Sequence, residues 1–162
     1  MSDSAGLLRP QSASVLPTRL GWREWVGLPG LDIRSIRAKL DTGARSSSLH
    51  VEWIRVEVEQ GERVARFGVR LRRRAQRVRE CAAPIVDRRP VRDSGGHSSQ
   101  RWFVRTRLAL AGRECEIDIN LTDRGGMLFP LLLGRSALAG RFQVDPGLSY
   151  SLPRPRPLPD PA

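Results

Sequence analysis

The chain has 162 residues, of which 40% are hydrophobic, and this is enough for one folded domain with no sign of a second. Its formal net charge is +11, and Lys39 is the only lysine among 28 basic residues. The N-terminus lacks a basic start followed by a sustained apolar stretch, and no apolar run is long enough to span a membrane. We therefore expect a soluble, cytoplasmic protein rather than a membrane protein.

The two ends of the chain differ in composition from its middle. Residues 1–17 are rich in Ser, Ala and Pro, residues 152–162 are rich in Pro, and neither segment shows hydrophobic periodicity. Such segments cannot bury enough apolar surface to offset the entropy that is lost on folding. We therefore predict a disordered tail at each end and a folded domain over residues 18–151.

The folded part is dominated by β-strand patterns. Alternating polar and apolar residues, separated by turns that contain Gly, are typical of half-buried strands. Many short strands with little helix indicate a mainly β fold, either a small barrel or a sandwich. The predicted strands cover residues 20–26, 33–40, 49–59, 64–72, 102–110 and 113–121, and a short helix is predicted at residues 136–139.

Asp41 follows the second of these strands and begins the sequence Asp41-Thr42-Gly43-Ala44. An aspartic peptidase needs two carboxylates that face each other and share one proton, because two like charges about 3 Å apart cannot both ionise. This chain has one such loop, so a second copy would have to supply the other carboxylate. Asp and Gly are also frequent in ordinary turns, and a turn without chemistry is the alternative.

A glycine-rich turn lies between two extended segments in the second half of the chain. Ser94, Gly95 and Gly96 stand between residues 86–93 and residues 100–105. Glycine permits a tight turn and keeps its tip pliable, so we predict a mobile hairpin. The alternative is a surface hairpin without a role in function, because loops of this composition are common.

A second motif lies near the end of the folded part. An apolar run from Phe129 to Leu133 ends in Gly134 and Arg135 and passes into the predicted helix. Asp-Thr-Gly-Ala followed later by apolar-apolar-Gly-Arg resembles the retropepsins, the single-lobed aspartic peptidases typified by retroviral proteases. The two motifs together are much more specific than either one alone.

More of the chain is similar to one bacterial retropepsin-like family, whose members are often labelled ATP-dependent zinc proteases. Some members are linked to enzymes that add glutamate tails to ribosomal protein S6. The similarity spans the chain from residue 20 to about residue 151. Its clearest segments are residues 21–26, 38–45, 92–96, 121–124, 132–138 and 144–146.

The resemblance implies a retropepsin-like closed β-barrel of one lobe with a short C-terminal helix. It also implies a homodimeric aspartic peptidase that hydrolyses a protein or peptide substrate with Asp41, Thr42 and Gly43 as its catalytic residues. In the retropepsins a hairpin closes over the substrate, as the predicted one would here. The residues expected to contact substrate are Ala44, Arg45, Ser94, Gly95, Gly96 and Arg135.

The residues give little support to the family's ATP and zinc label. A phosphate-binding loop needs a Gly-rich run with Lys and Ser or Thr, whereas the only lysine lies inside a predicted strand. The histidines and cysteines, His50, His97, Cys81 and Cys115, are far apart in sequence and form no local metal motif. We therefore expect neither a cofactor nor a metal, and a zinc peptidase with ligands from distant segments is a minor alternative.

The positive charge predicts acidic partners. Residues 70–79 contain six arginines and no acid, and such a surface attracts glutamate-rich peptides, RNA or ribosomes, although many charge runs are merely solvated. A catalytically silent adaptor that binds acidic protein or RNA through this face is therefore an alternative to the peptidase. Retroviral enzymes carry an acid at the place of Arg45, where it pairs with the arginine matched by Arg135. That pair cannot form here, and we hypothesise that Arg45 holds an acidic side chain of the substrate.

Overall fold

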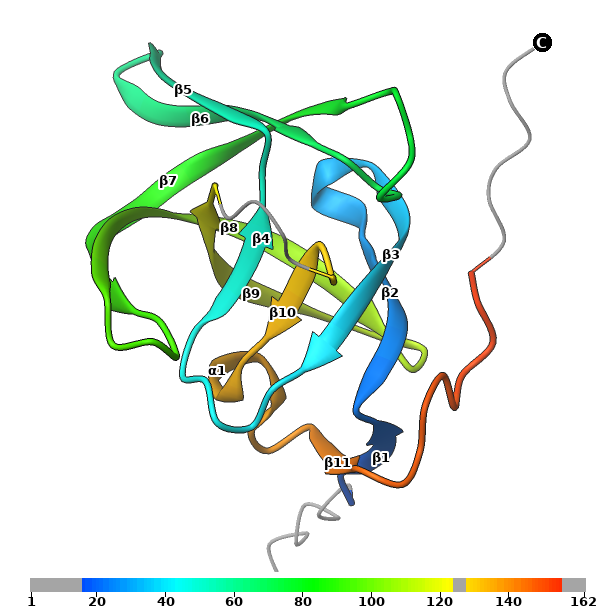
Figure 1. The fold of residues 1–162 in the computed structure, drawn as a ribbon. Coiled ribbons are helices and arrows are strands. Elements are labelled where there is room, and N and C mark those ends of the chain that lie inside the picture. Colours follow the sequence, from blue (N-terminus) through cyan, green and yellow to red (C-terminus); the bar gives the residue numbers. More distant parts are fainter. Residues whose placement is uncertain (1–15, 124–127, 156–162) are drawn as a thin grey trace, which may run out of the picture.

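A closed barrel of β-strands forms the centre of the computed structural model, which describes residues 16–123 and 128–155 (Figure 1). Gly27 pairs with Ala109 and closes the circle of strands. The predicted mainly β, retropepsin-like fold is thus confirmed. Around the barrel the order is β2 (Arg23–Leu28), β3 (Ile33–Leu40), β10 (Leu131–Leu133), β4 (Ser47–His50), β9 (Arg113–Thr122) and β8 (Ser98–Leu110).

Further elements extend this barrel at both ends. Strand β8 continues into a sheet of β7 (Arg79–Arg92), β6 (Glu62–Val69) and β5 (Trp53–Glu59), which extends to the top of Figure 1. At the opposite end, β1 (Thr18–Gly21) and β11 (Phe142–Asp145) form a parallel pair. The helical elements of the described residues are a 3-10 turn, η1 (Pro29–Leu31), and the helix α1 (Arg135–Leu138), and none of them is long and apolar enough to cross a membrane.

Apolar side chains from the barrel strands fill its interior. Ile36, Leu49, Leu108, Ile119 and Leu131 come from five different strands and are all fully buried. Each such side chain contributes about 1.5–3 kcal/mol when it leaves water. Because side chains alternate along a strand, the residues between them face the outside of the barrel, and the candidate site lies on this outer face.

Two predicted strands are each divided in the structure. The predicted strand at residues 49–59 leaves the barrel after β4, because the Val51 N–H donates to the Thr122 carbonyl, whereas the Glu52 N–H donates to the carbonyl of Gly68 in β6. The predicted strand at residues 20–26 breaks at Trp22, between β1 and β2. Apolar residues occur on both sides of each break, so the sequence pattern did not reveal the change of partner strand.

The segment that follows β11 packs against β2. Glu24 is fully buried, and its carboxylate accepts hydrogen bonds from the N–H groups of Ser151 at 2.9 Å and Leu152 at 3.3 Å. The Arg154 guanidinium lies 4.0 Å from the centre of the Trp25 ring. The first residues of the predicted C-terminal tail are therefore held on the barrel.

The rest of both predicted tails cannot be compared with the structure. Residues 1–15 and 156–162 lie outside the described residues. The helix predicted at residues 136–139 is found one residue earlier, as α1, and the strand predicted at residues 64–72 ends at Val69. These shifts leave the order of elements unchanged.

Candidate active site

The predicted catalytic loop begins where β3 ends. The Asp41 N–H donates to the Leu133 carbonyl at 2.8 Å, which fixes the start of the loop against β10. The Gly43 N–H donates to Asp41 Oδ1 at 2.9 Å, and the Ala44 N–H donates to the Asp41 carbonyl at 3.3 Å. The other carboxylate oxygen, Oδ2, has no hydrogen-bond partner among the described residues, so it is available to a water molecule or to a second carboxylate.

The Gly-Arg segment supports this loop from behind. The Arg135 N–H donates to the Ala44 carbonyl at 2.8 Å, and the Ser136 N–H donates to the Arg45 carbonyl at 3.0 Å. A β-carbon on residue 134 would lie 2.5 Å from the Ser46 carbonyl oxygen, so only glycine allows the two backbones to approach this closely. The two sequence motifs are thus in direct contact.

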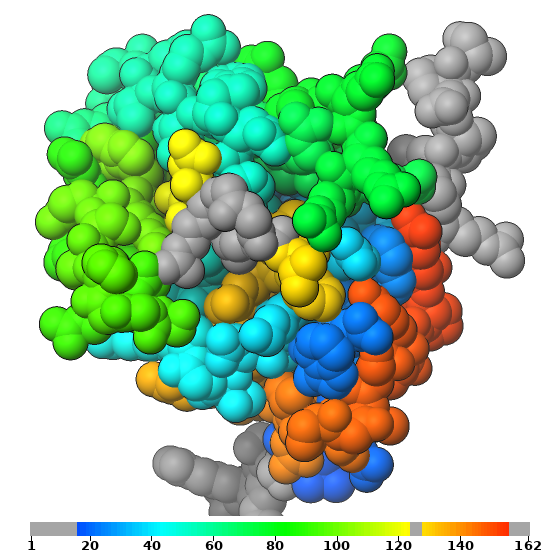
Figure 2. Space-filling view, viewed as in Figure 1, coloured from blue at the N-terminus to red at the C-terminus, as the bar shows by residue number. Residues whose placement is uncertain are grey.

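Asp41 lies on the wall of a cleft of about 1070 Å³. In Figure 2 the surface is hollowed between the cyan loop that follows β3 and the green tip of the β7–β8 hairpin. Leu132 of β10 lies on the same wall as Asp41, and Phe129 adds an aromatic surface. The cleft therefore combines a carboxylate, apolar surface and the tip of a hairpin. Its charged and polar lining residues include Lys39, Arg45, Ser48, Arg89, Arg92, Asp93, Ser94 and Arg101.

The structure brings part of the predicted site to this cleft. Of the residues expected to act in catalysis or substrate binding, Asp41, Gly43, Ala44, Arg45 and Ser94 line it. The side chain of Asp41 is half-buried, whereas Arg45 and Ser94 are exposed. A role for any of them in catalysis or in substrate contact remains a prediction.

The remaining predicted residues lie off the cleft wall. Arg135 stands behind the loop, where its Nη1 donates to the Thr42 carbonyl at 3.1 Å, and the exposed Thr42 does not line the cleft. Gly95 and Gly96 form the exposed turn of the hairpin, in which Gly96 has a φ of +83° that favours glycine. The Arg135 side chain therefore braces the backbone of the Asp41 loop rather than reaching the cleft.

Sequence reasoning missed several basic residues of the cleft. Lys39 precedes Asp41 by two positions, and this spacing places both on the same face of the strand. That spacing could have predicted Lys39 as a residue of the site. Arg92 and Arg101 lie on the two arms of the hairpin, and their approach to Asp41 depends on how the hairpin folds back, which periodicity does not reveal.

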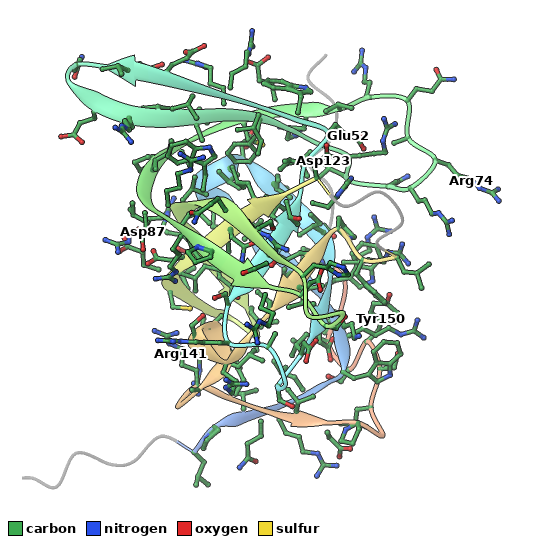
Figure 3. The ribbon with its side chains drawn as sticks, turned by 60° about the vertical axis from the view of Figure 1, so that its left-hand side comes forward. Glu52, Arg74, Asp87, Asp123, Arg141 and Tyr150 are labelled. Atoms are coloured by element: carbon green, nitrogen blue, oxygen red, sulfur yellow. The ribbon has the colours of Figure 1, made fainter. Side chains whose placement is uncertain are left out.

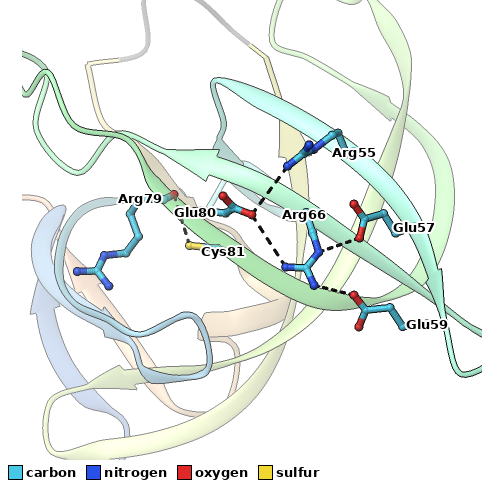
Figure 4. A network of polar contacts seen from close by, with 7 residues as sticks. All are labelled: Arg55, Glu57, Glu59, Arg66, Arg79, Glu80 and Cys81. Carbon is cyan, nitrogen blue, oxygen red and sulfur yellow. Dashed lines mark hydrogen bonds and ion pairs between the residues drawn. The ribbon is translucent and has the colours of Figure 1, made fainter.

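The cleft differs in electrostatics from the rest of the surface. Arg66 lies on the sheet of β5, β6 and β7, here called the outer sheet. It contacts Glu57 at 2.8 Å and Glu59 at 2.7 Å, and these acids raise its pKa (Figure 4). In contrast, Lys39, Arg45 and Arg92 have no ion-pair partner among the described residues. Within the part of the chain that the structure describes, the cleft wall thus carries cations that no acid pairs with.

The histidines and cysteines do not gather at this site. In residues 16–123 and 128–155, no three His, Cys, Asp or Glu side chains lie together in a way that could hold a metal ion. Both cysteines are free thiols, and burial raises the pKa of Cys81 to about 11. Cys115 is only partly buried. The carboxylates that line the cleft, among the described residues, are those of Asp41 and Asp93.

The family model described as "Retropepsin-like aspartic endopeptidase RimB" matches residues 19–155. The chain belongs to this RimB-like family. The suspected resemblance to a bacterial retropepsin-like family is thereby confirmed. The matched residues include the Asp41 loop, the β7–β8 hairpin and the Gly134-Arg135 segment, so the whole cleft described above lies inside the family's homologous region.

Relatives of this RimB-like chain include proteins that are much longer. A "Probable alpha-L-glutamate ligase" from Desulfotalea psychrophila is 37% identical over 134 residues, and one of the same name from Parasynechococcus marenigrum is 35% identical over 146 residues. Each match covers 82% of this chain, and the chain spans 29% of the length of these relatives. The homologous unit is therefore a part of a larger protein in them.

A solved structure shares the fold of this RimB-like chain. It is a protein of unknown function from Legionella pneumophila, with a TM-score of 0.70 and 30% sequence identity. The match covers 83% of this chain and 97% of that chain. The barrel described here thus corresponds to nearly all of that protein.

The contact between the two motifs gives a test of the site's architecture. Gly134 has an extended backbone that any residue can adopt, so Gly134→Ala acts only through the clash of its new methyl group with the Asp41 loop. We expect the free energy of unfolding to fall by about 1–3 kcal/mol, measured by chemical denaturation. Ser136→Thr adds a methyl group at an exposed position of α1 and should change it by less than about 0.5 kcal/mol. Equal stabilities of the two variants would contradict the close fit.

Proposed function

We propose that the protein is a homodimeric aspartic endopeptidase in which each of two copies supplies one Asp41. The observation that carries the proposal is the placement of the Asp41 carboxylate at the cleft wall, held through Oδ1 by the Gly43 N–H, with Oδ2 available. Membership of the RimB-like family supports it, because that family is described as aspartic endopeptidases. One chain has half of the carboxylate pair, which is why the proposal requires a dimer.

The chemistry follows from two carboxyl groups that share one proton. The ionised Asp41 removes a proton from a water molecule, whose oxygen attacks the peptide carbonyl carbon, while the protonated Asp41 of the second copy donates to the carbonyl oxygen. The tetrahedral intermediate then collapses as the C–N bond breaks: the nitrogen takes the proton that the first Asp41 removed from water, and a hydroxyl proton of the intermediate returns to the second Asp41. The Gly43 N–H holds Asp41 Oδ1 in place, so the orientation of the carboxylate is set before a water molecule binds.

The charge of the cleft supports an acidic substrate. Lys39 and Arg45 lie on either side of Asp41 in the sequence, and Arg92 lies on the hairpin, so the peptide path is bordered by cations. The relatives named alpha-L-glutamate ligase support a glutamate-containing substrate, since their name specifies that amino acid. A guanidinium binds a carboxylate through charge-assisted hydrogen bonds, worth about 1.5–3 kcal/mol each.

Asp41→Asn should abolish hydrolysis without dissociating the dimer. Asparagine keeps the shape of the side chain and an oxygen for the Gly43 N–H, but it cannot act as a base. We expect cleavage of a glutamate-rich peptide, followed by mass spectrometry, to fall by at least about 10³-fold, with an unchanged dimer mass by light scattering. Asp32→Asn alters an exposed aspartate that pairs with Arg79 at 2.9 Å and should retain activity. Cleavage by the Asp41 variant, or by a wild-type monomer, would contradict the proposal.

Arg45→Ala should weaken cleavage of acidic peptides selectively. Loss of one guanidinium–carboxylate contact corresponds to about a tenfold fall in kcat/KM for a glutamate-rich peptide. A neutral peptide of the same length should change by less than about threefold, because it never made that contact. Arg63→Ala removes an exposed arginine of the β5–β6 hairpin and should change kcat/KM for neither peptide. An equal loss on both peptides would refute the role of Arg45 in specificity.

A second candidate function is the binding of a polyanion by the loop at residues 70–79. The loop is anchored at one end, where Arg70 contacts Glu52 at 2.8 Å and Leu71 packs against the core. Arg72, Arg73, Arg74 and Arg77 are exposed, and Figure 3 shows Arg74 projecting away from the molecule. An anchored loop with exposed arginines favours RNA or ribosome binding, as an adaptor would require.

Salt dependence distinguishes this second function from the first. If the four exposed arginines contact phosphates, the affinity for an RNA hairpin should fall with a log–log salt slope of about 3. Their joint replacement by serine should remove most of that slope, whereas Asp41→Asn should leave it unchanged. Fluorescence anisotropy between 50 and 200 mM salt, a range chosen on the order of cellular ionic strength, measures this. Binding that survives the fourfold replacement would rule out the loop as the RNA site.

A further inference from the structure

A chain of buried polar groups connects the hairpin to the catalytic loop. Asn120 and Ser47 are fully buried, and Arg101 is only 8% exposed. Burying such groups is unfavourable unless their hydrogen bonds are made, so a chain of them identifies positions where geometry is held closely. These three residues belong to three neighbouring strands, β9, β4 and β8.

Asn120 is the centre of this chain. Its Oδ1 accepts a hydrogen bond from Arg101 Nη1 at 3.0 Å and another from Ser48 Oγ at 2.9 Å. Its Nδ2 donates to the Ser47 carbonyl at 2.8 Å. Ser47 Oγ in turn accepts from the Gly134 N–H at 3.0 Å. The single amide therefore joins an arm of the hairpin to the strand and to the glycine that support the Asp41 loop.

The strand register places Asn120 where it can make this connection. Asn120 is paired with Ser48 of β4 on one side and with Phe103 of β8 on the other. Paired residues of neighbouring strands point to the same face of a sheet. Arg101 lies near the start of β8, directly after the hairpin turn, whereas Ser47 begins the strand that follows the Asp41 loop. Strand β9 thus stands between the strand that follows the Asp41 loop and the strand that follows the hairpin turn (Figure 1).

We propose that Asn120 and Arg101 are positioning residues that couple the β7–β8 hairpin to the Asp41 loop. The hairpin tip and the loop are opposite walls of one cleft, and the residues at the tip are mostly exposed. The buried contact at Arg101 therefore sets the separation between the hairpin and the Asp41 loop across the cleft. The effect on catalysis rests on the proposed peptidase function, but the coupling itself is a property of the folded chain.

Hydrogen exchange tests the coupling without any assay of activity. Arg101→Gln cuts the hairpin side of the chain, and Asn120→Asp keeps the acceptor for Arg101 but loses the donor to Ser47. Each variant should speed exchange at least fivefold at two places. One is the hairpin turn, where the Gly96 N–H donates to the Asp93 carbonyl, and the other is the Arg135 N–H that donates to the Asp41 loop. Arg107→Gln, an exposed arginine of the same strand paired with Glu114, should change neither.

Two outcomes of the exchange experiment would overturn the coupling. Acceleration confined to the mutated side, at the hairpin for Arg101→Gln or at the loop for Asn120→Asp, would show independent walls. Equal acceleration at buried core amides such as Ile36 would show only a less stable fold. Arg101→Lys keeps a charged donor, so its exchange rates at both places should lie between those of the wild type and of Arg101→Gln.

Kinetics on a glutamate-rich peptide then tests the role in substrate binding. A loosened hairpin should raise KM at least fivefold in Arg101→Gln while kcat stays within threefold. A fall in kcat at unchanged KM is the signature of a smaller folded fraction and would overturn the positioning role. If the wild-type protein cleaves no peptide, the proposed function fails, whereas the exchange experiment still decides whether the two walls are coupled.

Discussion

The close backbone contact between the Asp41 loop and the Gly134-Arg135 segment is the constraint on which the cleft depends. Three hydrogen bonds hold it, from the N–H groups of Asp41, Arg135 and Ser136 to carbonyls of the facing segment. Glycine at position 134 leaves no room for anything but backbone at the closest point. The backbone of the Asp41 loop and the start of α1 are therefore held together by this one contact, and the Gly43 N–H then orients the carboxylate.

Much of the site could be predicted because its signals are local. The alternation that identified β3 ends at Asp41, and the Gly-Arg motif that carried the resemblance is the segment found against the Asp41 loop. The basic wall of the cleft could not be predicted in the same way. Arg92 and Arg101 reach the cleft only because a long hairpin folds over it, and strand register over such distances is not encoded in periodicity. The split between β4 and β5 was missed for the same reason.

The distribution of ion pairs concentrates the unpaired positive charge of this very basic chain in particular places on its surface. On the outer sheet, acids on neighbouring strands face the arginines, as around Arg66, and surface pairs of this kind contribute little to stability. They do cancel the field at that surface. The cleft and the middle of the loop, at Arg72, Arg73, Arg74 and Arg77, carry cations without an ion-pair partner among the described residues, and these therefore attract an approaching anion within a screening length of about 8–10 Å.

The single lysine of this chain has a chemical consequence. Lys39 is exposed on the cleft wall, two residues before Asp41, and every other basic side chain besides the two histidines is a guanidinium. An amine-selective acylating reagent therefore finds one side chain to modify, and that side chain is beside the carboxylate. A fluorophore attached there would report on the interior of the cleft, and the acyl group would remove one positive charge from its wall.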